Sequence, residues 1–71
     1  MSWSGGVIER SGAWVLIRDQ DGRRHGWKVH SIQGISDADV DQTSTIISVS
    51  GGRHVVVEAP LEEVAVTIAI P

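Results

Sequence analysis

With 71 residues, a formal net charge of −3 and no cysteine, the chain has the size of one small domain, over residues 1–71, without disulfides or thiolate-bound zinc. We therefore expect self-association to support its core. The acidic balance and the lack of a basic run argue against binding to duplex nucleic acid. No signal-peptide pattern opens the chain and no apolar stretch suits a bilayer, so we expect a cytoplasmic protein without membrane contact.

In the first half of the chain, apolar clusters alternate with polar breaks that contain glycine, a pattern typical of a β-meander. Three short strands are predicted: one beginning at Val7 and Ile8, one over residues 13–18 and one over residues 25–32. In the second strand Val15 and Ile17 share one face, while Trp14 and Leu16 share the other. Because both faces are apolar, we expect this strand to be central or covered on both sides.

Residues 33–44 are polar and contain only Ile35 and Val40 as apolar anchors, so we expect a connecting loop with at most one helical turn. Three aspartates stand at alternate positions in this segment, as in some calcium-binding loops. The glycine at the sixth position and the glutamate at the twelfth position of such a loop are missing. We therefore predict a solvated loop and no metal site.

Residues 45–58 carry the strongest local signal, because two β-branched runs flank Gly51 and Gly52. This pattern predicts a β-hairpin. A three-residue loop that pairs Ser50 with His54 separates the side chains best by polarity. One face then carries Ile47, Val49, Val55 and Val57, and the other carries Ile46, Ser48, Ser50, His54, Val56 and Glu58.

Residues 60–71 fit both a helix and a strand. Pro60 and the acids after it suit a helix that begins at Leu61, with Leu61, Val64, Ala65 and Ile68 on one stripe. The alternation of Val64, Val66, Ile68 and Ile70 suits a strand instead. Either form is expected to cover the apolar face of the hairpin. We predict an α+β fold, mainly antiparallel β, in which a sheet of four or five strands is followed by a short C-terminal helix. The alternative is an all-β small barrel with a C-terminal strand.

No pattern of nucleophile, base and acid indicates catalysis, and no glycine-rich turn opens a helix that could hold a phosphate. Among the histidines, His25 and His30 lie at opposite parity on one predicted strand and cannot share a metal ion there. We therefore predict a protein that is not an enzyme, with no catalytic residue, no metal and no cofactor.

The candidate interaction surface combines aromatic and basic side chains. Tryptophan is a frequent anchor of protein contacts, and basic groups beside an aromatic ring also suit single-stranded nucleic acid. We expect residues 1–5 to be flexible, with Trp3 docking on the domain or on a partner. The candidate residues are Trp3, Trp14, Trp27, Lys28, His30, Arg53 and His54.

Over residues 29–66 the order of features resembles the small flagellar and swarming proteins of the FlbD/SwrD-like family. The resemblance rests on a hairpin that ends in a V-x-E motif and on an E-E-V motif that opens a C-terminal helix. The matching residues are Thr45, Ile47, Val49, Gly52, Val57, Glu58, Glu62, Glu63 and Val64. The resemblance implies a small non-enzymatic protein that acts through contacts with other proteins, and it brings no catalytic residues.

From these observations we expect a small protein-binding or regulatory module that forms homo-oligomers. One alternative is a phage or bacterial accessory protein that inhibits a larger machine, since short acidic β proteins can offer a sheet edge to a partner. A second alternative is a ring-forming β protein that binds single-stranded nucleic acid or a small ligand, with Trp27, Lys28 and His30 lining a subunit interface.

Overall fold

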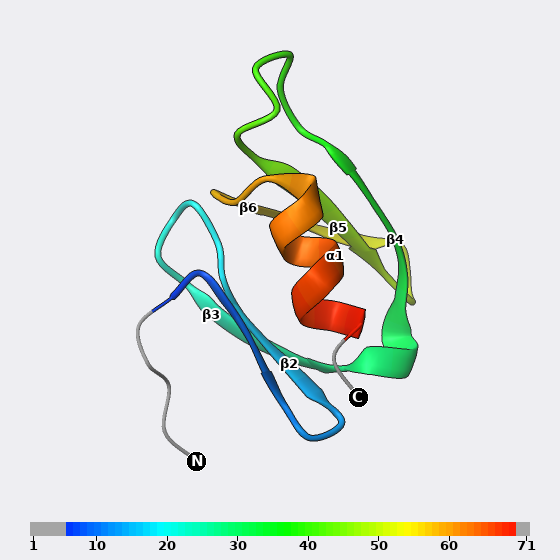
Figure 1. Cartoon of the computed structure of the whole chain (residues 1–71). Coiled ribbons are helices and arrows are strands. Elements are labelled where there is room, and N and C mark those ends of the chain that lie inside the picture. Colours follow the sequence, from blue (N-terminus) through cyan, green and yellow to red (C-terminus); the bar gives the residue numbers. More distant parts are fainter. Residues whose placement is uncertain (1–5, 70–71) are drawn as a thin grey trace.

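A computed structural model of the protein describes residues 6–69 (Figure 1). In chain order the elements are β1 (Ile8–Ser11), β2 (Trp14–Arg18), β3 (Arg24–Lys28), the 3-10 helix η1 (Val29–Ser31), β4 (Ile32–Asp37), β5 (Thr45–Val49), β6 (Arg53–Val57) and α1 (Leu61–Ala69). They form two antiparallel sheets of three strands, a first sheet in the order β1-β2-β3 and a second in the order β4-β5-β6. The predicted α+β class, mainly antiparallel β with a C-terminal helix, is confirmed. The predicted sheet of four or five strands and the alternative of a closed barrel are both wrong.

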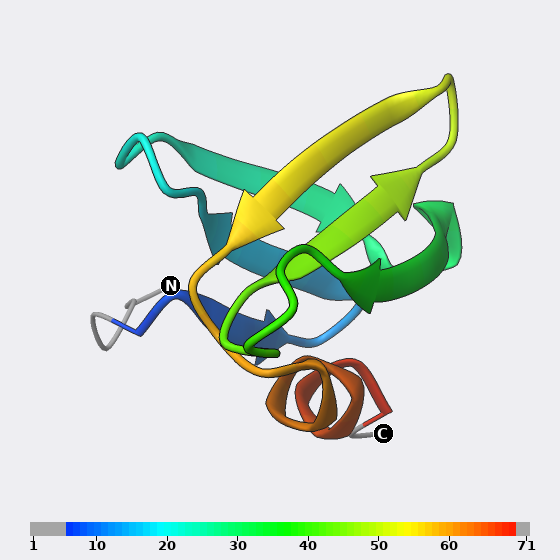
Figure 2. The same ribbon diagram turned by 90° about the horizontal axis from the view of Figure 1, so that it is seen from above.

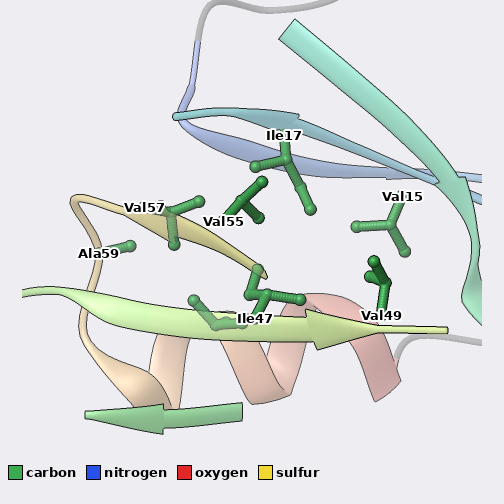
Figure 3. Close-up of a cluster of buried hydrophobic side chains, with 8 residues drawn as sticks. Val15, Ile17, Ile47, Val49, Val55, Val57 and Ala59 are labelled. Carbon is green, nitrogen blue, oxygen red and sulfur yellow. The ribbon is translucent and has the colours of Figure 1, made fainter. Parts of the chain in front are cut away.

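The two sheets face each other across one core (Figure 3). The buried apolar side chains come from both sheets, from the segment after β6 and from α1: Val15, Ile17, Ile47, Val49, Val55, Val57, Ala59 and Val64. The predicted apolar face of the hairpin is thus buried. We predicted that the C-terminal segment would cover this face. In the structure α1 contributes to the core, and the first sheet also covers the face with Val15 and Ile17.

The chain divides into two sheets at η1. The strand predicted over residues 25–32 ends at Lys28, and Val29–Ser31 form a 3-10 turn that leads into a new strand. β1 begins at Ile8 and β2 at Trp14, close to the predicted positions. As predicted, β2 is the central strand of its sheet. Its outer face, which carries Trp14, remains partly exposed.

β4 is the element that differs most from the prediction, because residues 33–44 were expected to form a loop. Ile32 pairs with Val49 and Ile35 pairs with Ile47, so both isoleucines lie on the core side although they are three residues apart. A register shift between Ile32 and Gly34 makes this possible, since an extra residue in a bulge restores the side-chain alternation. The loop is therefore confined to residues 38–44.

The second hairpin has the predicted loop length but not the predicted pairing. Val49 pairs with Arg53 and Ser48 with His54, so Ser50, Gly51 and Gly52 form the three-residue loop. Both glycines have positive φ, 88° and 76°, which a residue with a side chain adopts only with strain. The difference from the predicted pairing is two residues. Because strands alternate with a period of two, the same side chains still face the core.

Helix α1 closes the open side of the molecule between β1 and β4, as Figure 1 and the view from above in Figure 2 show. It begins at Leu61 as predicted, which rules out the alternative strand over the described part of this segment; Ile70 lies outside the described residues. Val64 is buried and Val66 is 65% exposed, in agreement with the predicted helical stripe. Arg10 of β1 donates a hydrogen bond from Nη1 to the Ile68 carbonyl near the end of the helix.

A buried hydroxyl connects the second sheet to the start of α1. Thr45 of β5 is fully buried, and its Oγ1 donates a 2.7 Å hydrogen bond to the carbonyl of Ala59, which is itself buried. The bond orients the segment that leads from β6 into the helix. Within residues 6–69 no helix reaches the length and apolar character that crossing a bilayer requires.

Candidate interaction surface on the first sheet

The outer face of the first sheet is the face turned away from Val15 and Ile17. Residues that are cross-strand partners share a face, and Trp14 pairs with Lys28 while Leu16 pairs with Gly26. We call this surface, made by the alternate residues of β1, β2 and β3, the Trp14 face. Its members are Glu9, Ser11, Trp14, Leu16, Arg18, Arg24, Gly26 and Lys28.

Trp14 lies at one end of this surface, where β2 begins and where β1 and β3 end, and it is 41% exposed. A Cβ atom placed on Gly26 would lie 3.7 Å from Trp14 Cε3 and 3.5 Å from Leu16 Cδ2. Both side chains therefore lie next to Gly26, at distances that are ordinary van der Waals contacts for a Cβ atom. The Lys28 Nζ lies 5.2 Å from the centre of the Trp14 ring, within the range of a cation–π interaction. The result is an aromatic ring that is held in place yet open to contact.

The Trp14 face is positively charged although the protein as a whole is acidic. Arg18, Arg24 and Lys28 stand on it together with one acid, Glu9, whereas the formal net charge of the chain is −3. Arg24 and Lys28 are exposed. Such a surface attracts an anionic partner electrostatically, and the exposed tryptophan at one end of it can contribute apolar contact area.

Trp27 lies on the opposite, inner face of the first sheet. It pairs with Val15, is half-buried and packs against the core. Its ring stacks on that of His25, with centroids 5.1 Å apart and planes inclined by 4°. Trp14 and Trp27 therefore do not share one surface, since neighbouring strands present them to opposite sides of the sheet.

His25 is in turn bound to the β2–β3 turn. Its Nε2 donates to Asp19 Oδ2 over 2.8 Å, and Asp19 Oδ1 accepts hydrogen bonds from the backbone N–H groups of Asp21 and Arg23. The bond from His25 is the main cause that lowers the pKa of the Asp19 carboxyl, against an opposing effect of desolvation and with support from the two N–H groups. These contacts give His25 and Trp27 a structural role in the turn.

The remaining candidate residues lie apart from Trp14. His30 is exposed on η1, and Arg53 and His54 are exposed at the start of β6 in the second sheet. His54 Nδ1 lies 3.4 Å from the hydroxyl of its cross-strand partner Ser48. Trp3 and the rest of residues 1–5 lie outside the described part of the chain. Of the predicted set, the structure thus brings Trp14 and Lys28 together.

The acidic β4–β5 loop is held in shape by hydrogen bonds to one of its own residues, Asp39. Its carboxylate accepts hydrogen bonds from the Thr43 hydroxyl and from the backbone N–H groups of Thr43 and Ser44. The Thr43 hydroxyl is the main cause that lowers the pKa of Asp39, again against desolvation. Across residues 6–69, no three His, Asp or Glu side chains gather in a way that could hold a metal ion.

Sequence reasoning missed the role of Gly26 and the surface around β4. Gly26 lies within the strand predicted over residues 25–32, but its place next to the Trp14 and Leu16 side chains follows only from the structure. Leu16 and Lys28 were recognised on their own strands, but only the register of β2 against β3 shows that Lys28 lies next to Trp14. A cross-strand argument for residues 14–28, like that made for residues 45–58, is the signal that points to this contact.

Comparisons of the chain with models of protein families, with curated proteins and with solved structures found no match, so the Trp14 face is interpreted from its own geometry.

Proposed function

We propose that the protein is a small non-enzymatic binding module that contacts other proteins through the Trp14 face. The observation that carries the proposal is the Trp14 ring, which is 41% exposed on the outer face of the first sheet with the Lys28 Nζ 5.2 Å from its centre. Tryptophan and arginine are the residues that contribute most often to the binding energy of protein interfaces. Here Trp14 stands with Arg18 and Arg24 on the same face.

The charge of this face selects the kind of protein that it fits. An acidic segment of a partner places carboxylates near Arg24 and Lys28 while apolar groups cover Trp14 and Leu16. The partly buried Leu16 beside the ring adds apolar area to the centre of the surface, and charged groups surround it, an arrangement common in protein interfaces. The resemblance to the FlbD/SwrD-like family, with its implied protein contacts, points in the same direction.

Single-stranded nucleic acid is the second candidate for the same face. An exposed aromatic ring stacks on bases of any sequence, and nearby cations hold the phosphates. The specific observation in favour of this alternative is that Lys28 lies beside Trp14 and that Arg18 and Arg24 stand at the other end of the same face. The acidic net charge of the chain disfavours it, because long-range repulsion opposes the approach of a polyanion.

The experiment immobilises the wild-type protein and the Trp14→Ala variant and passes an extract of the protein's native cells over each. The proteins that the two retain are then compared. We expect at least one protein to be retained by the wild type and to bind at least about tenfold more weakly to Trp14→Ala, because removal of an anchor tryptophan costs about 2 kcal/mol. Val66→Ala is the control, since it also removes an exposed apolar side chain but lies on α1. Circular dichroism verifies that both variants are folded.

Two results would count against this function. If the wild type and Trp14→Ala retained every protein equally, the Trp14 face would not take part in partner binding. Binding of a fluorescent oligonucleotide such as oligo-dT, lost on Trp14→Ala and weakened steeply by salt, would replace the protein partner with single-stranded nucleic acid.

A further inference from the structure

We infer that the free edge of β4 binds the same edge of a second copy of this chain, so that the two second sheets join into one continuous antiparallel sheet. This inference rests on the proposed function in treating the protein as a contact module. It uses a surface other than the Trp14 face, so the two can fail separately. The surface consists of the outer edge of Ile32–Asp37 and the groove beside it.

β4 is an edge strand with hydrogen-bonding groups that point outward. The N–H of Ala38 donates to the carbonyl of Ser44 in the register of β4 against β5, so Ala38 and Ser44 form a hydrogen-bonded pair. Hydrogen-bonded pairs alternate along an antiparallel ladder, which makes Ile35 and Ile47 a non-bonded pair. The N–H and C=O of Ile35 therefore point away from β5. No strand within residues 6–69 pairs with β4 on that side (Figure 1).

An apolar groove of about 270 Å³ adjoins this edge, between β4 and the last turns of α1. Five of its seven lining residues are apolar: Ile32, Ile35, Ala65, Ile68 and Ala69, with Gln33 and Gly34 completing it. A strand added to the β4 edge extends the floor of this groove. Natural edge strands are often protected by lysine, proline, bulges or inward charges. β4 carries no lysine or proline, and its bulge at Gln33 and the acid Asp37 at its end leave Gly34, Ile35 and Ser36 as the unprotected part of the edge.

Self-complementarity identifies the occupant as a second copy. If Ile35 lies opposite Ile35 of the second copy about a two-fold axis, each Ile35 N–H donates to the other Ile35 carbonyl. The same antiparallel register brings Gln33, the extra residue of the bulge, closest to Asp37 of the other copy. The amide of Gln33 can then donate to the carboxylate of Asp37, and the two acids stay apart. Parallel pairing in register would instead bring the two Asp37 side chains together.

The contact is small, because one strand pair and one groove bury less than the roughly 1,200 Å² of a stable interface. We therefore expect a dissociation constant of roughly 10 μM to 1 mM. Sedimentation or light scattering over that concentration range should show the mass rising from 7.6 kDa toward twice that value. This measurement detects association without locating it.

Amide hydrogen exchange locates the contact. The Ser36 N–H already bonds within the second sheet, because Ser36 and Ile46 form a hydrogen-bonded pair, whereas the Ile35 N–H points outward. We expect the exchange of the Ile35 amide to slow as concentration rises, while that of Ser36 stays slow throughout. Association without concentration-dependent protection at Ile35 would overturn the inference, as would a monomer over the whole range.

Charge substitutions at Gln33 test the register. Gln33→Lys places a cation near Asp37 of the second copy and Gln33→Asp places an acid there, twice in each dimer. We expect association to be strengthened by the first change and weakened by the second, roughly 2- to 30-fold in each case. Within one chain the two positions are about 13 Å apart along the strand, too far for a strong direct effect.

The matched controls are Gln20→Lys and Gln20→Asp, which make the same charge changes at an exposed glutamine in the β2–β3 turn. Equal effects at both sites would indicate a response to net charge and refute the register. If Ile35 became protected only when another protein was added, the edge would serve that protein and not a second copy. Trp14→Ala should leave dimer formation unchanged. If the protein formed this dimer but bound no partner through the Trp14 face, only the proposed function would be contradicted.

Discussion

The buried hydroxyl of Thr45 offers a test of what connects the sheets to the helix. Thr45→Val keeps the shape of the side chain but removes the 2.7 Å hydrogen bond to the Ala59 carbonyl. Because Thr45 is fully buried and Ala59 is only 1% exposed, water cannot readily replace the lost donor. An unsatisfied buried polar group costs about 1 to 3 kcal/mol.

The new methyl group of the valine acts in the opposite direction, since burial of one methyl-sized group contributes about 0.8 kcal/mol. We therefore expect Thr45→Val to lower the free energy of unfolding by about 0.2 to 2 kcal/mol, the difference between these two contributions. In a domain of this size that corresponds to a decrease of about 1 to 16 °C in the melting temperature. Urea unfolding followed by circular dichroism measures the change, at a protein concentration too low for dimers.

The sign of the effect decides between the two contributions. If the hydrogen bond to Ala59 contributed nothing, Thr45→Val would be as stable as the wild type or more stable, and the reasoning would be refuted. Thr45→Ser is the control. It keeps the donor and loses only a methyl group, so its cost of about 1 kcal/mol arises from packing. An unchanged urea m-value in both variants would show that the unfolding transitions are comparable.

Other substitutions test the packing and the turns. Gly26→Ala should stabilise the protein by about 0.4 to 1 kcal/mol in urea unfolding, because the φ of Gly26 is not positive and an added Cβ meets its neighbours at ordinary contact distance. Gly51→Ala should instead destabilise the protein by about 1 kcal/mol, because Gly51 has a φ of 88°. The opposite order would contradict the backbone assignment. Val64→Ala should cost about 1 to 3 kcal/mol in the same assay, whereas Val66→Ala, on the exposed side of α1, should change stability by less than about 0.5 kcal/mol. Equal effects would mean that the helix presents another face. The lowered pKa of Asp19 means that its carboxylate stabilises the fold above the ordinary pKa of 3.8, and this contribution is lost as the pH falls through the folded-state pKa. Asp19→Asn should therefore reduce the loss of stability on acidification, and an unchanged pH profile would exclude that role.

The helix and the second hairpin were predictable because their signals are local. Pro60 with the acids after it defines the start of α1, and the β-branched runs around Gly51 define the hairpin. The core face of that hairpin was predicted correctly even though the pairing differs by two residues. A shift of two changes neighbours and leaves faces unchanged, so composition alone cannot distinguish the two registers.

β4 was not predictable from alternation, because the bulge near Gln33 places Ile32 and Ile35 on one side of a strand at a spacing that is typical of a helix. The division into two sheets was hidden for a related reason. Val29 and Ile32 continue the apolar pattern of β3, and only the 3-10 turn between them redirects the chain. The Trp14 face could be predicted in part, since Trp14 and Lys28 were both candidates, but their contact depends on pairing between strands.

The arrangement of two consecutive meanders also bears on how the protein folds. Every strand pair joins neighbours in the sequence, so each sheet can form from local contacts, which favours rapid folding. The contacts of α1 with β1 join opposite ends of the chain, with Arg10 and Ile68 separated by 58 positions. We expect the sheets to form early and the docking of the helix to be the late step. A ribosome would therefore have to release the chain as far as Ile68 before the helix can dock, and until then the side of the core that α1 covers stays exposed.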